Sequence, residues 1–465
     1  MFASTELKMP SIQTPSVNRR ILHAALSVGA AGVIVKLVAT FKEIAVAGVY
    51  GRSDAMDAFL AAALIPSLLV NLISESMNQA LVPTLIRVRE QEGRERAQQL
   101  LSNSMLWMCL LLFAASVVMA LGARLYFPLI ASHFPAEKLA LSIRLFYGLL
   151  PIVLITGIAT NCTAVLNTLH RFTLPALAPI IISVAIILGA LMLGSRLGIW
   201  AMVYSTLAGS LIHAGIVAGM MHARGYDFRL RWCGVTESTR EVARQYGPVL
   251  LSSLVASGGL LVDQSMAALL PAGSVSALVY ANRFVSVVLT LLAGAVSTAI
   301  VPYLSTLVAQ RDWAGCRHTL RTWVGIMALV SVPVAALLIF AARPLIRIAF
   351  QHGAFGPGDT AAVTPVLAMY AIQIPFFAVS RVYYRFIVAM RRTDLVLYCG
   401  ILNLVLDVIL NLLLMRWFLH MHWSGVAGIA LATSLWTVST WALLWYWSRR
   451  LLLTSSSPNA ASRKR

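Results

Sequence analysis

The hydrophobic residues of this chain fall into long apolar runs, which short polar and arginine-rich segments separate. A helix needs about 20 apolar residues to cross a bilayer, and we count about 12 runs near that length. The predicted spans are residues 26–50, 56–86, 101–122, 142–168, 174–195, 199–221, 247–270, 276–306, 322–342, 363–389, 394–415 and 424–447. The pattern therefore predicts an all-α polytopic membrane protein.

The overall composition supports this class. Hydrophobic residues make up 59% of the chain, charged residues 11%, and mean hydropathy is +0.81. Soluble domains rarely exceed half apolar residues. The five cysteines show no CxxC spacing, which argues against a disulfide framework or a zinc site. The first 20 residues are polar, and no cleavable signal-peptide pattern precedes the first span.

The basic residues that give the net charge of +19 lie mainly in the loops and tails on one side of the predicted spans. With an even number of spans, roughly 23 basic residues lie in the loops and tails on one side and about 8 on the other, so both termini are predicted to be cytosolic. The basic residues lie in short loops between apolar runs, and no basic helix of the kind that binds nucleic acid is present. Nucleic acid is therefore not expected as a partner.

The chain also repeats itself at an offset of about 220 residues. Gln79–Leu85 resembles Thr298–Leu304, and Leu150-Pro151 corresponds to Ile374-Pro375. An even number of spans in each half makes the halves parallel repeats, which in transporters enclose a central cavity. The alternative is a chance similarity between two hydrophobic sequences. The expected organisation is a tail (1–25), a six-helix lobe (26–222), a cytosolic linker (223–246), a second six-helix lobe (247–450) and a basic tail (451–465).

Charged residues within the first spans are the main functional candidates. A charge at mid-bilayer costs about 2.5–3.5 kcal/mol, so it needs a wet cavity, a partner or a substrate. Lys36 and Lys42 lie on the same half of the first helix, and Glu43 shares a face with Lys36. One interpretation is an internal Lys–Glu pair that holds helices together. The other is a cationic cavity wall for an anionic ligand.

Arg283 lies about two turns inside the eighth predicted span. A guanidinium group stays charged and binds phosphate oxygens through two parallel hydrogen bonds. With Lys36 and Lys42 it would surround a diphosphate from both lobes; the alternative is that it reaches the outer surface.

A second group of polar residues is predicted within the C-terminal lobe. Asp263 and Asp407 lie at nearly one depth, Asn403 is one turn from Asp407, and Thr433 lies nearby on the last span. These oxygen donors suit a hard cation, for which we expect sodium with a proton as the rival. The alternative is a hydrogen-bonded helix clamp. No nucleophile–base pair, HExxH or P-loop is present, so an enzyme and any further cofactor are not expected.

These motifs together resemble the MurJ/MviN family of bacterial lipid II flippases, in the multidrug/oligosaccharidyl-lipid/polysaccharide exporter superfamily. The resemblance covers nearly the whole chain. It rests on Asp57-Ala58-Phe59 followed by Pro66, Glu75 and Ala80–Pro83, on Phe172–Pro179, on Tyr280–Arg283 and on Ile300–Pro302.

The resemblance implies roles for particular residues. Lys36, Lys42 and Arg283 match the family's cavity arginines, and Asp57 and Glu75 match acids of the second helix, so all five are expected to bind substrate. Asp263, Asn403, Asp407 and Thr433 resemble a sodium site that some members carry. The chain departs from the family at Val70-Asn71, where many members carry a basic pair, at Ser76, where they carry glycine, and in having lysines for the two arginines of the first helix.

The resemblance implies an alternating-access flippase in the bacterial cytoplasmic membrane. It would move a polyprenyl-diphosphate-linked saccharide, either lipid II or a related envelope or exopolysaccharide precursor, to the outer leaflet, in contact with membrane lipids and cell-wall or polysaccharide synthesis proteins. The first alternative is a cation-coupled drug or metabolite exporter of the same superfamily. An envelope polymerase or glycosyltransferase would need larger outer loops, and a scaffold would leave the buried charges unexplained.

Overall fold

We describe a computed structural model of the chain, which covers residues 15–131, 133–169, 173–228, 230–390 and 392–456. Within these ranges every regular element is a helix. The first half contains α1 (Pro15–Tyr50), α2 (Asp54–Leu69), the π-helix η1 (Val70–Glu75), α3 (Ser76–Gln91), α4 (Arg94–Ile130), α5 (Ala136–Leu149), α6 (Pro151–Thr168), α7 (Thr173–Leu177), α8 (Ile180–Leu197) and α9 (Trp200–His222). The second half contains α10 (Glu237–Ala267), α11 (Ser274–Ala309), α12 (Trp313–Phe340), α13 (Ala342–Phe350), α14 (Pro357–Ala371), α15 (Gln373–Ala389), α16 (Thr393–His420) and α17 (Gly425–Ser456).

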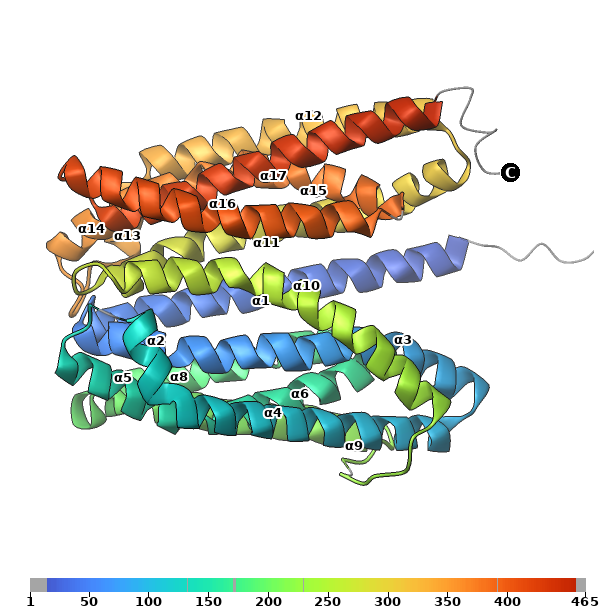
Figure 1. Ribbon diagram of the computed structural model, residues 1–465, viewed down its shortest axis with the longest axis horizontal. Coiled ribbons are helices and arrows are strands. Elements are labelled where there is room, and N and C mark those ends of the chain that lie inside the picture. Colours follow the sequence, from blue (N-terminus) through green and yellow to red (C-terminus); the bar gives the residue numbers. More distant parts are fainter. Residues whose placement is uncertain (1–14, 132, 170–172, 229, 391, 457–465) are drawn as a thin grey trace, which may run out of the picture.

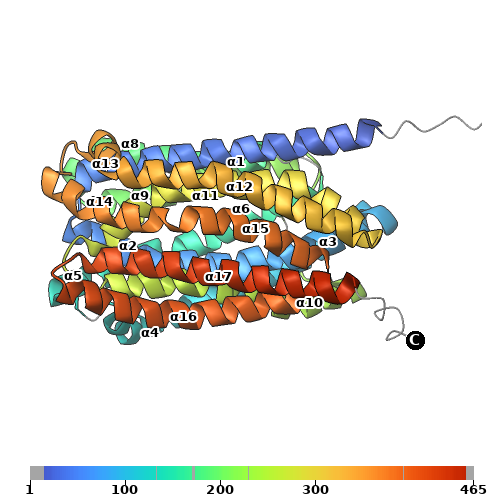
Figure 2. The same cartoon turned by 90° about the horizontal axis from the view of Figure 1, so that it is seen from above.

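The described helices confirm the predicted membrane class. Eleven helical segments are long and apolar enough to cross a bilayer, and α1 covers the remaining predicted span, residues 26–50. The helices run roughly parallel to the long axis of the molecule (Figures 1 and 2). The fourth predicted span, 142–168, is in fact two helices that meet at Leu150. Pro151 begins the second helix, since it has no N–H to continue the first.

The order of elements repeats between the halves. The segment α2–η1–α3, residues 54–91, corresponds to α11, and α4 corresponds to α12. The broken pair α5–α6 corresponds to α14–α15, which is interrupted at Ile372, three residues before Pro375. The final helix pairs α8–α9 and α16–α17 also correspond. The repeat expected from two short sequence motifs thus extends through whole helices.

The outer helices expose their apolar side chains, as lipid-facing helices do. On α4, Leu121, Leu125 and Leu129 are each about 80% exposed, and Phe340 on α12 is 87% exposed. By contrast, about two thirds of the apolar stretch in α2–η1–α3 is buried inside the protein. This inner segment carries Asp57 and Glu75, two of the residues expected to act chemically.

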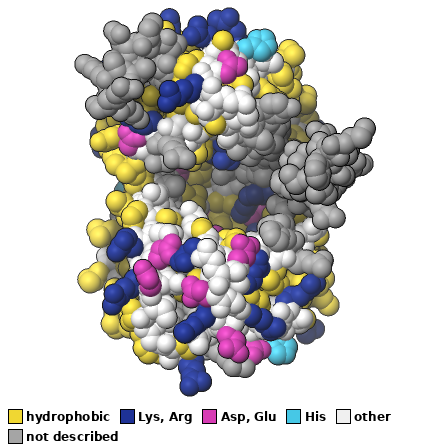
Figure 3. Space-filling view, turned by 90° about the vertical axis from the view of Figure 1, so that its right-hand side faces the viewer, with side chains coloured by type: hydrophobic (Ala, Val, Ile, Leu, Met, Phe, Trp, Pro, Cys, Tyr) yellow, Lys and Arg dark blue, Asp and Glu magenta, His cyan; other side chains and the backbone are white. Residues whose placement is uncertain are grey.

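The two halves touch through a small set of helices. From the first half, α1 and α2 contact α11, whereas α3 contacts α10. The helix α10 crosses between the halves (Figure 1), with its first turns near α3 and α4 and its last turns near α16. The molecule is hollowed between the halves at the end where α1 begins and α17 ends, and basic side chains are visible in the hollow (Figure 3).

Candidate functional site

A buried carboxylate joins the two halves between the hollow and the opposite end of the molecule. Glu43 Oε1 lies 2.8 Å from Lys42 Nζ on the same helix and 2.8 Å from Arg283 Nη2 on α11. The Glu43 side chain is only 3% exposed, whereas Arg283 is 33% exposed. Lys42 lies about 12 Å before the end of α1 and Arg283 about 14 Å after the start of α11, at 1.5 Å per residue. The two cations therefore lie at about the same depth along the helices, one contributed by each half.

Lys36 adds a further positive charge to this group. It is half-buried and close enough to Arg283 to interact with its charge. Among the described residues no carboxylate lies within ion-pair distance of Lys36. An internal Lys–Glu pair does form, but through Lys42 and not through Lys36, which we placed on the helix face of Glu43. Glu43 contacts two cations and Lys36 adds a third charge nearby, so the group of four residues has a net charge of +2. Such a group can attract a diphosphate while the single acid limits repulsion between the cations.

Asp57 closes the end of the molecule opposite the hollow, which the distribution of basic residues predicts to be the outer end. Its two carboxylate oxygens accept hydrogen bonds from Gly273 N (2.7 Å) and Ser276 N (2.9 Å), at the start of α11. Gly273 is the N-cap residue of α11 and has no side chain to cap it, so the first half supplies the capping group. We expected Asp57 to bind substrate, but the structure places it in contact with α11, where it is 1% exposed.

Further polar contacts seal this outer end. Arg52 Nε donates to Gly273 O (2.9 Å), and Tyr280 Oη donates to Gly51 O (3.0 Å). Ala354 N donates to Gly48 O (2.7 Å), so backbone meets backbone across the halves. Gly51 has φ +57°, and a Cβ there would lie 2.6 Å from Ala354 O. We call these contacts, together with those of Asp57, the outer seam.

Lys138 supports the outer seam and was not anticipated from the sequence. Its Nζ lies 2.6 Å from Asp54 Oδ1 and 3.2 Å from Asp57 Oδ2, and it packs 4.0 Å from the Phe134 ring centre. Lys138 falls between the predicted third and fourth spans, so hydrophobic patterning carried no signal for it.

Glu75 lies at the end of the π-helix η1 and is exposed. Ser67, Asn71 and Gln79 are exposed on the same helical segment, at intervals of four residues around Glu75. Their neighbours are mostly buried, and polar side chains are unfavourable against lipid, so this stripe fits a wall of the hollow. Ser76, a departure from the family pattern, points instead to α10 and bonds to Ser253 Oγ at 2.9 Å.

The second group lies inside the C-terminal half. Thr433 Oγ1 donates to Asp263 Oδ2 (3.0 Å), and Asn411 Nδ2 bridges Asp263 Oδ1 (2.8 Å) and Asp407 Oδ1 (3.2 Å). The side-chain oxygens Asp407 Oδ2 and Asn411 Oδ1 are buried without a hydrogen-bond partner. Buried acceptors without donors are the chemistry that a small cation or a proton satisfies. The described residues contain no group of three His, Cys, Asp or Glu side chains placed to bind a metal ion.

The structure thus brings three of the four predicted ion ligands together. Asn403 is not part of this group. It lies one helical turn from Asp407, and its amide donates instead to Thr440 Oγ1 (2.7 Å). Asn411 takes part instead, although we did not predict it. Its spacing of four residues from Asp407 was the available signal.

The structure has two repeated helical halves that are joined at one end, hollowed at the other and carry cations between them. This arrangement defines a membrane transporter of the two-lobed type. Comparison with known families agrees with this class. The family model described as "Lipid II flippase MurJ" matches residues 46–461, and the chain belongs to this family.

Individual relatives show the same relationship. A probable lipid II flippase MurJ of Buchnera aphidicola is 24% identical over 93% of this chain and 84% of its own length. A lipid II flippase MurJ of Burkholderia cenocepacia is 27% identical over 76% of this chain and 70% of its own length.

Solved structures share the fold. A lipid II flippase MurJ in an inward closed conformation matches with a TM-score of 0.77 at 22% identity, over 92% of this chain and 89% of its own. An inward-facing multidrug resistance MATE family transporter has a TM-score of 0.73 at 14% identity, over 94% of this chain and 100% of its own. An outward-facing MATE family transporter has a lower TM-score of 0.62 at 15% identity, over 94% of this chain and 96% of its own.

Proposed function

We propose that the protein is a flippase that moves a polyprenyl-diphosphate-linked saccharide across the membrane by alternating access. Lipid II or a related envelope precursor is the substrate class, in line with the family to which the chain belongs. The chemistry is binding and release, with no covalent step. This proposal extends to a bacterial cytoplasmic membrane with both termini in the cytosol, which the distribution of basic residues supports.

The group Lys36, Lys42, Glu43 and Arg283 carries the proposal. It spans both halves, keeps a net charge of +2 and lies between the sealed outer end and the hollow. A diphosphate that enters from the hollow would contact cations of both halves and compete with Glu43 for them. Binding would therefore rearrange the contact between α1 and α11, which is one of the contacts that must change when the outer seam opens.

Flipping in proteoliposomes tests this assignment. Replacing Lys36 and Lys42 together by alanine should lower the flipping rate of a lipid-linked saccharide at least tenfold, because two of three headgroup cations are lost. A matched control is Arg343→Ala with Arg347→Ala, which removes two charges from α13, outside the group. Unchanged flipping in the lysine variant, or an equal loss in the control, would contradict the cavity assignment. Complementation of cells depleted of their lipid II flippase then separates lipid II from other precursors.

A monovalent cation at Asp263 and Asp407 is the proposed coupling ion, with sodium favoured and a proton as the rival. The unpartnered oxygens of Asp407 and Asn411 support it. The membrane potential would also contribute, at about 2.3 kcal/mol per charge per 100 mV.

Thermal unfolding in detergent with NaCl or KCl at equal ionic strength tests the ion site. Sodium should raise the apparent Tm of the parent, and Asp407→Asn should remove that gain because a ligand oxygen and its charge are lost. Asp394→Asn, at an exposed carboxylate of the same helix, is the control. If sodium and potassium stabilise the parent equally, the site does not select sodium.

A cation-coupled drug exporter is the alternative, since MATE transporters share the fold. The net positive charge at Lys36, Lys42 and Arg283 disfavours a cationic drug at that position by direct repulsion.

A further inference from the structure

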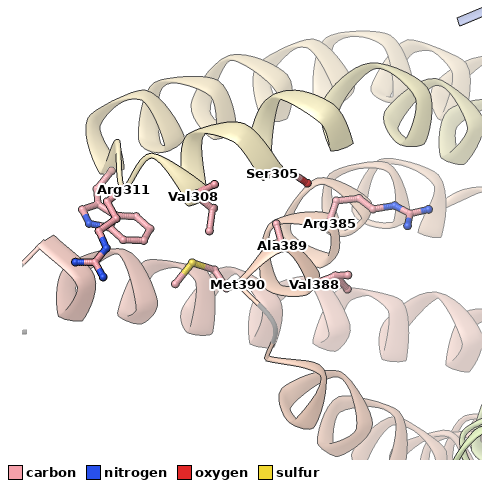
Figure 4. Close-up of a pocket in the computed structure, with 9 residues that line it drawn as sticks. Ser305, Val308, Arg311, Arg385, Val388, Ala389 and Met390 are labelled. Carbon is pink, nitrogen blue, oxygen red and sulfur yellow. The ribbon is translucent and has the colours of Figure 1, made fainter. Parts of the chain in front are cut away.

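Residues of α11, α15 and the start of α12 line an open cavity of about 600 Å³ near the end of the molecule where α17 ends. Arg311 and Arg385 lie at opposite ends of this cavity, with Val308, Ala389 and Met390 between them (Figure 4). Trp313 also lines it. The cavity is thus apolar along its length and cationic at its ends, and the flippase mechanism above uses none of it.

Arg311 occupies a backbone position that favours glycine. Its φ is +57°, and the turn after α11 has the two hydrogen bonds of a Schellman motif, from Arg311 N to Val308 O (3.1 Å) and from Asp312 N to Leu307 O (3.0 Å). Glycine usually takes this position, because a Cβ is unfavourable in the left-handed region. The preference of the backbone therefore does not explain an arginine at this position.

Positive charge continues from Arg311 into α12. Arg317 and Arg321 line a neighbouring cavity of about 370 Å³, and Trp313 belongs to both cavities. Among the described residues, no carboxylate lies within ion-pair distance of Arg311, Arg317 or Arg321.

The two nearby acids in the chain are already engaged. Asp312 Oδ1 accepts from Gly315 N (2.8 Å) as the N-cap of α12, and Asp394 Oδ2 lies 2.8 Å from Arg392 Nη2. The three arginines around Trp313 therefore form a cationic rim that the described part of the chain does not neutralise.

The chemistry of this rim matches an anionic lipid rather than a free anion. Guanidinium groups bind phosphate oxygens, while an indole and apolar walls suit the glycerol and upper acyl region at a membrane interface. A free anion would gain nothing from Val308, Trp313 and Met390. Juxtamembrane basic residues attract anionic lipids with about 1 kcal/mol each.

We propose that the turn at Arg311 and the start of α12, as far as Arg321, bind the phosphate of an anionic phospholipid in the leaflet on the side of the chain termini. Arg311, Arg317 and Arg321 hold the phosphate, Trp313 lies at headgroup level, and Val308 with Met390 contacts the lipid's apolar part. The site fixes the C-terminal half against one leaflet, and it does not depend on which substrate is flipped.

Lipid-dependent thermal unfolding of the full chain tests the site. Phosphatidylglycerol added to neutral detergent should raise the apparent Tm of the parent more than phosphatidylcholine does. Arg311→Gly should unfold at or above the parental temperature without lipid, because glycine suits the backbone, yet lose at least half of the phosphatidylglycerol gain. Arg317→Gln with Arg321→Gln should lose a similar share. A full gain in both variants would overturn the proposal, as would equal gains from the two lipids in the parent.

His422→Gly is a matched control for the backbone. His422 has φ +58° in the same kind of turn, after α16 at the other end of the molecule, with His422 N 3.1 Å from Leu419 O and Trp423 N 2.8 Å from Phe418 O. This variant should keep the whole phosphatidylglycerol gain, and its loss would show that the change in backbone, rather than the missing charge, explains Arg311→Gly.

Two further ligands separate the sources of phosphate. Inorganic phosphate at matched ionic strength should not reproduce the gain, and if it does, the site takes a free anion. Polyprenyl diphosphate should stabilise Arg311→Gly as much as the parent. Its selective loss in that variant would place substrate, not phospholipid, at the turn. Failure of the parent to flip any lipid would leave this result unaffected.

Discussion

Glu43 shows how one buried residue can hold a transporter's halves together. It is nearly inaccessible to solvent, and a lone carboxylate would be very costly in that position. Lys42 and Arg283 compensate it from two helices, and one of them belongs to the other half. These contacts stabilise the described conformation, and under our proposal a substrate anion would compete with Glu43 for the same cations.

Replacing Glu43 by glutamine should destabilise the protein, because Lys42 and Arg283 then face each other without a shared acid. Breaking a buried charge pair costs roughly 3–5 kcal/mol, and partial exposure of Arg283 places the expected effect at the low end. The apparent Tm in detergent measures it. The double variant Lys42→Gln with Glu43→Gln should recover part of the loss. Equal Tm values for Glu43→Gln and the parent would show that the contact carries no stability.

At the scale of elements, α11 begins with a helix end that its own half does not cap. Gly273 at the N-cap allows the left-handed turn (φ +80°) and the close approach of Arg52, but leaves N–H groups that Asp57 must satisfy from the first half. Because these groups are unsatisfied once the halves separate, the cap ties the stability of α11 to the closed outer seam.

Asp57→Ala should therefore favour opening of the outer seam. Losing a cap costs about 1–2 kcal/mol, which corresponds to roughly a 5- to 30-fold shift in the equilibrium. The separation of the halves can be measured by pulsed electron paramagnetic resonance between spin labels at Ala136→Cys and Gly358→Cys. The background for these variants has its five native cysteines replaced by serine. Asp54→Ala is the control, since Asp54 also binds Lys138, whereas the described hydrogen bonds from this helix to the first N–H groups of α11 come from Asp57. Identical distance distributions for Asp57→Ala and the parent would show that Asp57 does not hold the outer seam closed.

At the scale of the molecule, the halves are joined at the outer end and separated by a hollow at the other (Figures 1 and 3). Transport then requires the outer seam to break, so a covalent bond across the seam should stop it.

A disulfide between Gly51→Cys and Ala354→Cys makes this testable. A Cβ at residue 51 would lie 3.6 Å from the Ala354 Cβ, within the usual range for a disulfide. In the background without native cysteines, oxidation should abolish flipping and dithiothreitol should restore it. Gly51→Ser with Ala354→Ser measures the cost of the side chains alone, since they crowd Ala354 O. Full flipping by the oxidised, cross-linked protein would contradict an opening seam.

Several features could be predicted from the sequence because their signals are local. The spans follow from runs of apolar residues, and the repeat follows from paired motifs. Lys36, Lys42 and Arg283 were candidates because a charge inside an apolar run is unfavourable without a wet cavity, a partner or a substrate. The rise per residue placed Asp263 and Asp407 at nearly one depth, and in the structure Asn411 bridges the two carboxylates while Thr433 bonds to Asp263.

Other features depend on which helices meet. The exchange of Asn403 for Asn411, the capping role of Asp57 and the support from Lys138 all rest on contacts between residues far apart in the chain. The π-helix η1 likewise appears in no apolar pattern, because the pattern of exposed residues changes only slightly.

The sequence by itself determined the membrane class, the number of spans and the positions of the costly charges, since each follows from the transfer of nearby side chains into lipid. Only the tertiary structure decided which acid neutralises which cation, which end is closed and where the hollow lies. The physical reason is that hydrogen bonds and ion pairs act over a few ångströms, so their partners are chosen by helix packing and not by distance along the chain.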